Sequence, residues 1–273
     1  MTNQDFATRR LLQDNIEGFA GKLALPEVRH VGLADLKDAL AKGFDDFQAM
    51  PSHAIFLSLI YPIVGLAIGR LVFGRDLLPL LFPLAAGFAL VGPFAAIGLY
   101  ELSRRRERGM EVSWRHAFDV VHSRSFGAIV ALGLLLMAIF LIWVAVAQAI
   151  YVASFGYAPA ASIPDFLRQI FTTEAGWELI LVGNAIGFLF AVAVLSISVV
   201  SFPLLLDRPI GAPAAVLTSL RAVLRNPLSM ALWGLIVAVA LLLGSLPFLA
   251  GLAVVMPVLG HATWHLYRKV VAG

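Results

Sequence analysis

The chain of 273 residues contains no cysteine and few charged residues, and both absences limit what it can be. Without cysteine it has no disulfide, no thiolate nucleophile, and no Cys-ligated zinc or iron–sulfur cluster. Charged residues make up only 14% of the composition, which leaves too little water-facing chain for a large extramembrane catalytic domain. We also find no Walker A loop, no His-Glu-x-x-His, no nucleophile elbow and no dinucleotide-binding glycine fingerprint. We therefore expect the protein not to be an enzyme.

Apolar residues dominate what remains, and they are gathered into long charge-free runs. They account for 60% of the chain, and the mean hydropathy is +0.88, which is typical of membrane proteins rather than soluble domains. The run Asn226–Tyr267 is about twice as long as one membrane span, so we expect it to turn back near Pro247. The sequence predicts an all-α polytopic transmembrane helical bundle with six spans, at His53–Phe73, Leu77–Tyr100, Gly127–Gln148, Leu179–Leu205, Leu228–Ser245 and Phe248–Tyr267.

The positive charges lie in short segments beside the predicted spans and set the orientation of the chain. Of its 20 Lys and Arg residues, only Arg70, Arg75 and Arg168 fall on one side of the membrane, and the others share the opposite side. The positive-inside rule then places both termini in the cytoplasm of a multi-pass protein of the bacterial inner membrane, as an even number of spans also requires. Charges in these places meet anionic lipid, so we expect membrane lipid rather than nucleic acid as a partner.

Three cytoplasmic segments have the apolar periodicity of amphipathic helices that lie at the membrane surface. In the first, Leu33–Met50, apolar side chains recur at steps of three and four. The second begins after the N-cap Ser113, and the third begins near Pro213 and ends at Asn226, before a proline. Each precedes an odd-numbered span, as expected both of a threefold repeat and of ordinary cytoplasmic loops.

Two further segments complete the predicted organisation. On the outer side, Ser162 to Asp165 has the residues of a helix start, and Trp177 beyond it fits a membrane-interface anchor. Residues 1–30 lack a strong periodic pattern, and we expect a loose cytoplasmic tail there. A single transmembrane domain is expected over residues 31–273.

Three stretches of the sequence are similar to a known family: DDFQAMPSHAIFLSLIYPIVGL from Asp45, FTTEAGWELILVGNAIGF from Phe171 and VVMPVLGHATWHLYRKVV from Val254. Over about residues 30–270 the chain resembles six-span integral membrane proteins of alphaproteobacteria that are grouped under a domain of unknown function. Members are sometimes labelled cytochrome c oxidase subunit-like. The resemblance implies six spans and an inner-membrane location and brings no activity. The spans also lack the haem-ligand pattern of oxidase subunit I.

Histidines are the candidates for a metal or cofactor site. His261 and His265 are four residues apart and so share a helix face, and His53 opens the first span at a similar depth. Three imidazoles near one plane suit a transition metal or axial ligation of haem, and a metal- or haem-binding protein is therefore one alternative. Carboxylates at the right level to help are Asp46, Glu101 and Asp119. The other interpretation is an interfacial belt with no cofactor.

Arginines and glycines form two other patterns. An arginine cluster with the charge to fix topology or to bind an acidic lipid head group comprises Arg104, Arg105, Arg106 and Arg108. Glycines four residues apart let helices approach closely, within the protein or between subunits of a homo-oligomer. Such pairs are Gly65 with Gly69 and Gly183 with Gly187.

The middle of every predicted span lacks Asp, Glu, Lys and Arg, which ion-coupled carriers need. Asn184 and Ser198 are polar, so an uncoupled channel or carrier for a small neutral or lipid-like solute is a second alternative. We expect a non-catalytic accessory, assembly or scaffold protein. It would bind lipid or another membrane protein, such as a respiratory or other membrane complex.

Overall fold

The computed structural model describes residues 25–50, 96–157, 162–247 and 249–272, with a few single positions between residues 63 and 94. These residues form helices, and a single isolated β-bridge joins Val28 to Val271. The elements in chain order are α2 Leu33–Ala49, α6 Ile97–Glu107, the 3₁₀ helix η2 Trp114–His122, α7 Phe126–Phe155, α8 Ile163–Thr172, α9 Glu174–Ser198, α10 Ser201–Asp207, α11 Ala212–Arg225, α12 Pro227–Ser245 and α13 Leu252–Val270. The all-α prediction is confirmed for this part of the chain.

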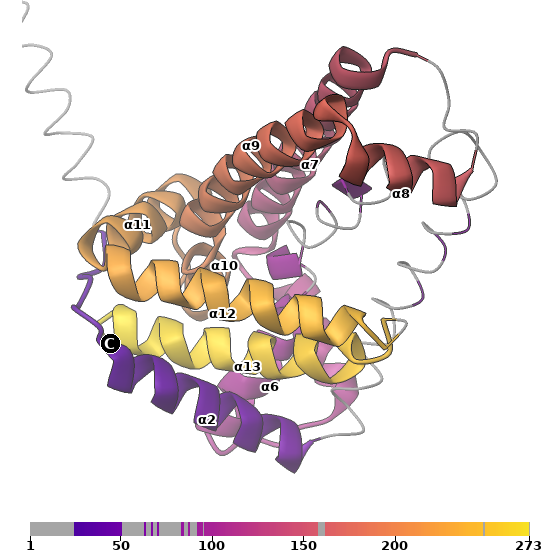
Figure 1. The fold of residues 1–273 in the computed structure, drawn as a ribbon. Helices are drawn as coiled ribbons and strands as arrows, with labels where there is room; N and C mark the ends of the chain where they lie inside the picture. Colours follow the sequence, from indigo (N-terminus) through magenta and orange to yellow (C-terminus); the bar gives the residue numbers. More distant parts are fainter. Residues whose placement is uncertain are drawn as a thin grey trace, which may run out of the picture.

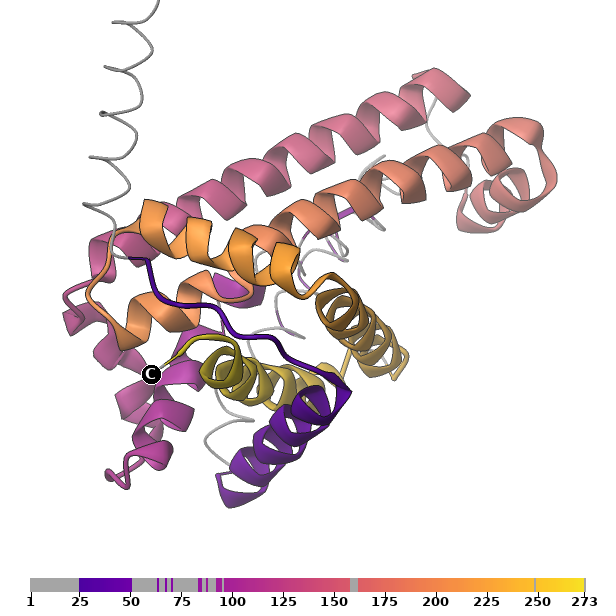
Figure 2. The same cartoon turned by 90° about the vertical axis from the view of Figure 1, so that its left-hand side faces the viewer.

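The helices form two parts that meet around the short helix α10. Figures 1 and 2 show α7 and α9 running side by side as a long hairpin, with α8 folded back at its far end. In the other part, α12, α13 and α2 lie next to one another. Helix α10 packs on α6, α7, α9, α11 and α13, and the side chains from Phe202 to Leu205 are fully buried there. The core of the molecule therefore lies where the hairpin joins the other part.

Three described helical segments are long and apolar enough to cross a membrane: Phe126–Phe155, Glu174–Asp207 and Pro227–Ser245. They correspond to the predicted third, fourth and fifth spans. The predicted first and second spans fall mostly outside the described residues. The predicted sixth span corresponds to α13, which is helical but is not among the three. Its last three turns bear His261, His265 and two basic residues, and these lower its hydropathy.

Local sequence signals explain where several helices begin and end. The Ser162 hydroxyl accepts a hydrogen bond from the Asp165 amide at the start of α8, as the helix-start motif predicts. Thr173 caps α9 in the same way through the Gly176 amide. The α9 helix ends at Ser198 and α10 resumes at Ser201, because Pro203 has no N–H to continue the backbone ladder. The segment after Ser113 is a 3₁₀ rather than an α-helix.

Residues 25–32 form an extended strap, although we expected residues up to 30 to belong to a loose tail. The Arg29 amide donates to the Val270 carbonyl at 2.7 Å. Asn226 closes the other side, since its Oδ1 accepts from the Val31 amide and its Nδ2 donates to the Arg29 carbonyl. A buried asparagine thus fastens the strap to the junction of α11 and α12. Residues 1–24 lie outside the described part.

Helix α2 packs along α13 in the opposite direction. At one end Lys269 bonds Asp35, and near the other end His265 bonds Asp46. A Cβ added to Gly43 would lie 2.5 Å from the Ala262 backbone, so the two helices touch where the side chain is absent. The buried residues of α2 are Leu36, Ala39, Gly43 and Asp46. Of the apolar residues that recur along the helix, Leu36, Leu40 and Phe47 pack in or against the core, while Leu33 and Phe44 are exposed.

Candidate functional site: a polar layer around helix α6

Helix α6 carries the charged segment Glu101–Arg108 into the middle of the packed helices. The Glu101 side chain is buried and binds Arg104 and Arg105, one turn further along the helix, at 2.7 and 2.9 Å. The other charged side chains of the segment bond to four more elements. The ion pairs to these elements are Arg105 with Asp119 of η2, Arg106 with Asp46 of α2, Arg108 with Asp207 of α10, and Glu107 with Arg268 of α13. We call these residues, with Ser103, His261 and His265, the polar layer.

Asp46 is the point where the polar layer joins α2, α6 and α13. The carboxylate is 2% exposed, and its Oδ2 accepts from Ser103 Oγ at 2.6 Å and from His265 Nε2 at 2.9 Å. Its Oδ1 accepts from Arg106. Burial by itself raises the pKa of Asp46, but the hydrogen bonds from His265, Ser103 and Arg106 outweigh it and hold the pKa below the ordinary value of 3.8. Asp46 is therefore an anion at neutral pH.

The charge of Asp46 fixes the protons on the neighbouring side chains. An ionised carboxylate only accepts, so Ser103 donates its proton to Asp46 and has only a lone pair left for His261 Nδ1, 2.7 Å away. His261 Nδ1 must then be the donor. Because a charged ring is costly in a fully buried place, we assign His261 as neutral, with its Nε2 as an acceptor. That Nε2 has no hydrogen-bond partner among the described residues.

Asp207 is the second junction of the polar layer and joins α6, α10 and α13. It accepts from Arg108 at 2.9 Å, from the Tyr267 hydroxyl at 2.8 Å and from Arg268 at 3.3 Å. The Asp207 side chain is 8% exposed, so three donors surround a nearly buried carboxylate. Neither Asp207 nor Ser103 belongs to a motif or cluster that is visible in the sequence. The available signal for Asp207 was its position as the first charge after the long apolar run of the fourth span.

The histidines predicted to bind a metal are engaged in the polar layer instead. His265 bonds Asp46, and His261 bonds Ser103. Within the described part of the chain, no three His, Asp or Glu side chains are grouped so that they could hold a metal ion. His53, the third predicted ligand, lies outside that part. The arrangement gives no support to a zinc, copper or haem site.

The arginine cluster is paired within the protein. Arg104, Arg105, Arg106 and Arg108 each contact at least one carboxylate, as given above. We expected these charges to fix topology or to meet an acidic lipid. The structure shows that they also cross-link α6 to its neighbours.

The described glycine pair lies on α9, and its two members have different surroundings. A Cβ added to Gly187 would lie 2.9 Å from the Trp143 ring of α7, so Gly187 lies where the two helices approach. A Cβ added to Gly183 would meet no described atom within 4 Å. Gly65 and Gly69 lie outside the described residues.

Asn184 and Ser198, the polar residues of the fourth span, bond to their own helix. Asn184 Nδ2 donates to the Ile180 carbonyl at 2.7 Å, and Ser198 Oγ donates to the Val194 carbonyl at 2.6 Å. Neither residue lines either of two cavities that lie between described residues. A solute path along these groups therefore gains no support.

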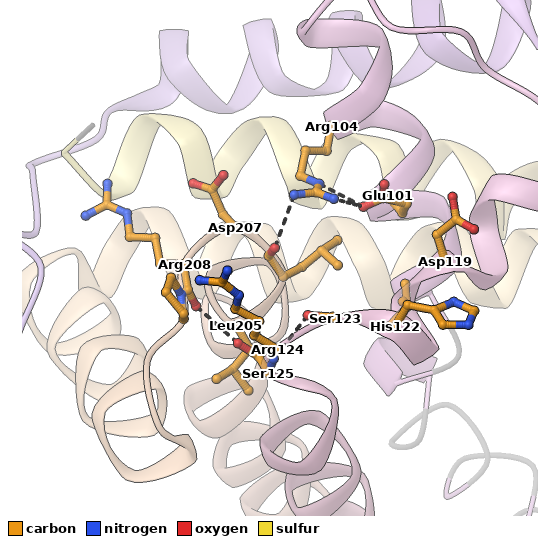
Figure 3. A pocket seen from close by; sticks show the side chains of 13 residues that line it. Glu101, Arg104, Asp119, His122, Ser123, Arg124, Ser125, Leu205, Asp207 and Arg208 are labelled. Carbon is orange, nitrogen blue, oxygen red and sulfur yellow. Dashed lines mark hydrogen bonds and ion pairs between the residues drawn. The ribbon is translucent and has the colours of Figure 1, made fainter.

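One of these cavities has a volume of about 330 Å³ and lies between η2, the start of α7 and the end of α10. Figure 3 shows Arg104 turned to Glu101 and to the backbone of the α10 end, while Arg124 points toward the same end from the start of α7. Ser125 donates to the Arg208 carbonyl at 3.3 Å and closes the floor. The cavity is open to solvent and is lined by charged and hydroxyl groups together with the apolar side chains Val120, Leu205, Leu206 and Pro209.

Comparison with known proteins gives one match. Residues 81–207 match the model of a family described as "Predicted integral membrane protein (DUF2189)". No curated protein and no solved structure matches the chain. The matched segment contains α6, η2 and the α7–α9 hairpin, so the family similarity covers two of the candidate spans and the part of the polar layer that lies on α6, η2 and α10. Together with the apolar helices, it identifies the chain as an integral membrane protein.

Proposed function

We propose that this integral membrane protein is a non-catalytic accessory or assembly factor of the bacterial inner membrane. It crosses the membrane six times, keeps both termini in the cytoplasm, and binds lipid or another membrane protein through its apolar helix faces. The bacterial location and the six spans follow from the charge distribution and from the resemblance described in the sequence analysis.

One contrast in the structure carries this proposal. The buried carboxylates Asp46, Glu101 and Asp207 are saturated by donors of the same chain. In contrast, only 17% of the most apolar window of α12 is buried, and on α9 the Phe188 side chain is 67% exposed. The interaction surface that remains is therefore apolar, which suits acyl chains and the transmembrane helices of a partner.

Purification of the tagged full chain in a mild detergent tests the proposal. We expect a membrane protein complex to accompany it in a fixed ratio, measured by mass spectrometry, and to assemble less well in a strain that lacks this chain. A variant with Leu235→Ala and Leu242→Ala, both exposed on α12, should lose the partner if that face binds it. The matched control is Leu134→Ala with Leu141→Ala on α7. Solute transport or turnover by the solitary protein in liposomes would contradict an accessory role.

The proposed topology has its own test, because the chain contains no native cysteine. Single replacements Ser113→Cys and Ser162→Cys place one thiol before η2 and one before α8. A membrane-impermeant maleimide added to intact cells with a permeable outer membrane should label only the second. Labelling of both positions, or of the first alone, would reject the orientation.

A further inference from the structure

The 330 Å³ cavity lies at the depth where two candidate spans leave the hydrocarbon. Its walls include the last residues of the segment Glu174–Asp207 and the residues just before Phe126, where α7 begins. A lipid bilayer has its phosphate groups at this level, because spanning helices end near the head groups. The volume is in the range of small-molecule binding sites, which begins at roughly 300 Å³.

The charges around the cavity leave one guanidinium free. All three lining carboxylates, Glu101, Asp119 and Asp207, already contact an arginine. Of the lining arginines, Arg104 binds Glu101, and Arg208 donates to the Ala272 carbonyl. Arg124 has no ion pair or hydrogen bond to any other described residue. An unneutralised guanidinium in a cavity whose acids are satisfied favours an anionic ligand.

The exposed face of η2 indicates what surrounds the cavity. Phe118 and Val121 are more than half exposed, and Trp114 is 37% exposed beside them. The Trp114 and Phe118 rings meet edge to face, with centroids 6.2 Å apart, and Arg115 lies over the Trp114 ring. Aromatic and basic side chains together are typical of the membrane–water interface. The cavity therefore opens beside a helix that is suited to lie among lipid head groups.

We propose that this cavity binds the phosphate group of an anionic phospholipid, with Arg124 as its principal ligand. The planar guanidinium can donate two parallel hydrogen bonds to phosphate oxygens, and Ser123 adds a hydroxyl at the cavity wall. Basic pockets at the cytoplasmic ends of spanning helices bind such head groups. The site rests on the membrane placement in the proposed function but requires no partner protein.

Lipid titration of the purified full chain in a neutral detergent tests this site. The unfolding midpoint, followed by tryptophan fluorescence, is measured against dioleoylphosphatidylglycerol, dioleoylphosphatidylcholine and sodium phosphate at constant ionic strength. We expect the anionic lipid alone to stabilise the protein saturably. In Arg124→Gln the half-saturating concentration should rise about tenfold, as for the loss of one charged hydrogen bond, and Arg124→Lys should fall between.

The matched control is Arg225→Gln, which removes the same charge from an exposed arginine outside the cavity at the end of α11. Equal weakening by both Gln variants would show diffuse electrostatics and overturn the site. Equal stabilisation by the two lipids would overturn it as well. Saturation by sodium phosphate with the same dependence on Arg124, and no added effect of lipid, would assign the cavity to free phosphate instead. Partner retention is measured in a separate purification, so either proposal can fail alone.

Discussion

The polar layer and the α7–α9 hairpin hold their helices together by different interactions. In the polar layer, the buried carboxylates of Asp46 and Asp207 accept several directional bonds from other elements, and these bonds link residues far apart in the sequence. In the hairpin, the Gly187 backbone approaches the Trp143 ring, and Trp143 also meets Phe190 with centroids 5.5 Å apart. Apolar helices gain little from contact with each other in lipid, so the hairpin depends on shape. The polar layer depends instead on keeping its charges paired.

The largest effect should come from removing the anion of the polar layer. Asp46→Ala leaves Ser103 and His265 without their shared acceptor in a largely buried place, and each unsatisfied group costs about 1–3 kcal/mol of unfolding free energy. Denaturant unfolding in detergent measures the change. The neighbouring Asp45→Ala, at an exposed position of α2, is the control and should stay within about 0.5 kcal/mol. Equal losses in both variants would show that the charge of α2, not its pairing, matters.

In the hairpin, a change of shape should have the next largest effect. Gly187→Leu must displace the Trp143 ring, and overpacking of this kind costs about 1–3 kcal/mol. Gly183→Leu, one turn away on the same helix, enters open space among the described atoms and should leave the unfolding midpoint unchanged. If Gly183→Leu proved to be the more damaging change, that face of α9 would be covered by something other than Trp143.

The sequence predicted the elements of the hairpin better than the contacts of the polar layer. Ser162 and Pro164 start α8 because capping is a local property, and the third to fifth spans follow from hydropathy alone. Only part of the buried face of α2 could be found in this way. Periodicity marked Leu36, but Ala39, Gly43 and Asp46 are buried because α13 approaches closely there, and no apolar pattern marks them.

At the candidate site, the sequence likewise predicted the positions of the histidines but not their partners. Spacing placed His261 and His265 on one helix face, but it contained no information about the distant Ser103 and Asp46 that bond to them. Those pairings depend on how α2, α6 and α13 pack. The arginine cluster is similar, since its charge was evident and most of its partners were supplied by three other elements.

A smaller effect should appear as a pH dependence confined to the polar layer. The pKa of Asp46 is lowered from 3.8 by its donors, so the stability that it contributes is complete above that value. This stability is lost as the pH falls through the lower pKa of the folded state. We expect Asp46→Asn to flatten the decline of the unfolding free energy below about pH 4, while Asp45→Asn should leave it unchanged. An unaltered decline in Asp46→Asn would mean that other carboxylates carry the acid sensitivity.

The smallest effect should come from an ion pair of the same chemistry at the tip of the hairpin. Arg168 contacts Asp165 on α8 at 2.7 Å, as Arg106 contacts Asp46, but the Arg168 side chain is 70% exposed. Water solvates both charges there and screens their attraction, so the pair adds almost nothing to stability. Arg168→Ala should leave the unfolding midpoint unchanged at low and high salt, whereas Arg106→Ala should lower it at both. A clearly lower unfolding midpoint in Arg168→Ala would show that a partner buries the tip of the hairpin. Ion pairs would then stabilise the hairpin as well as the polar layer.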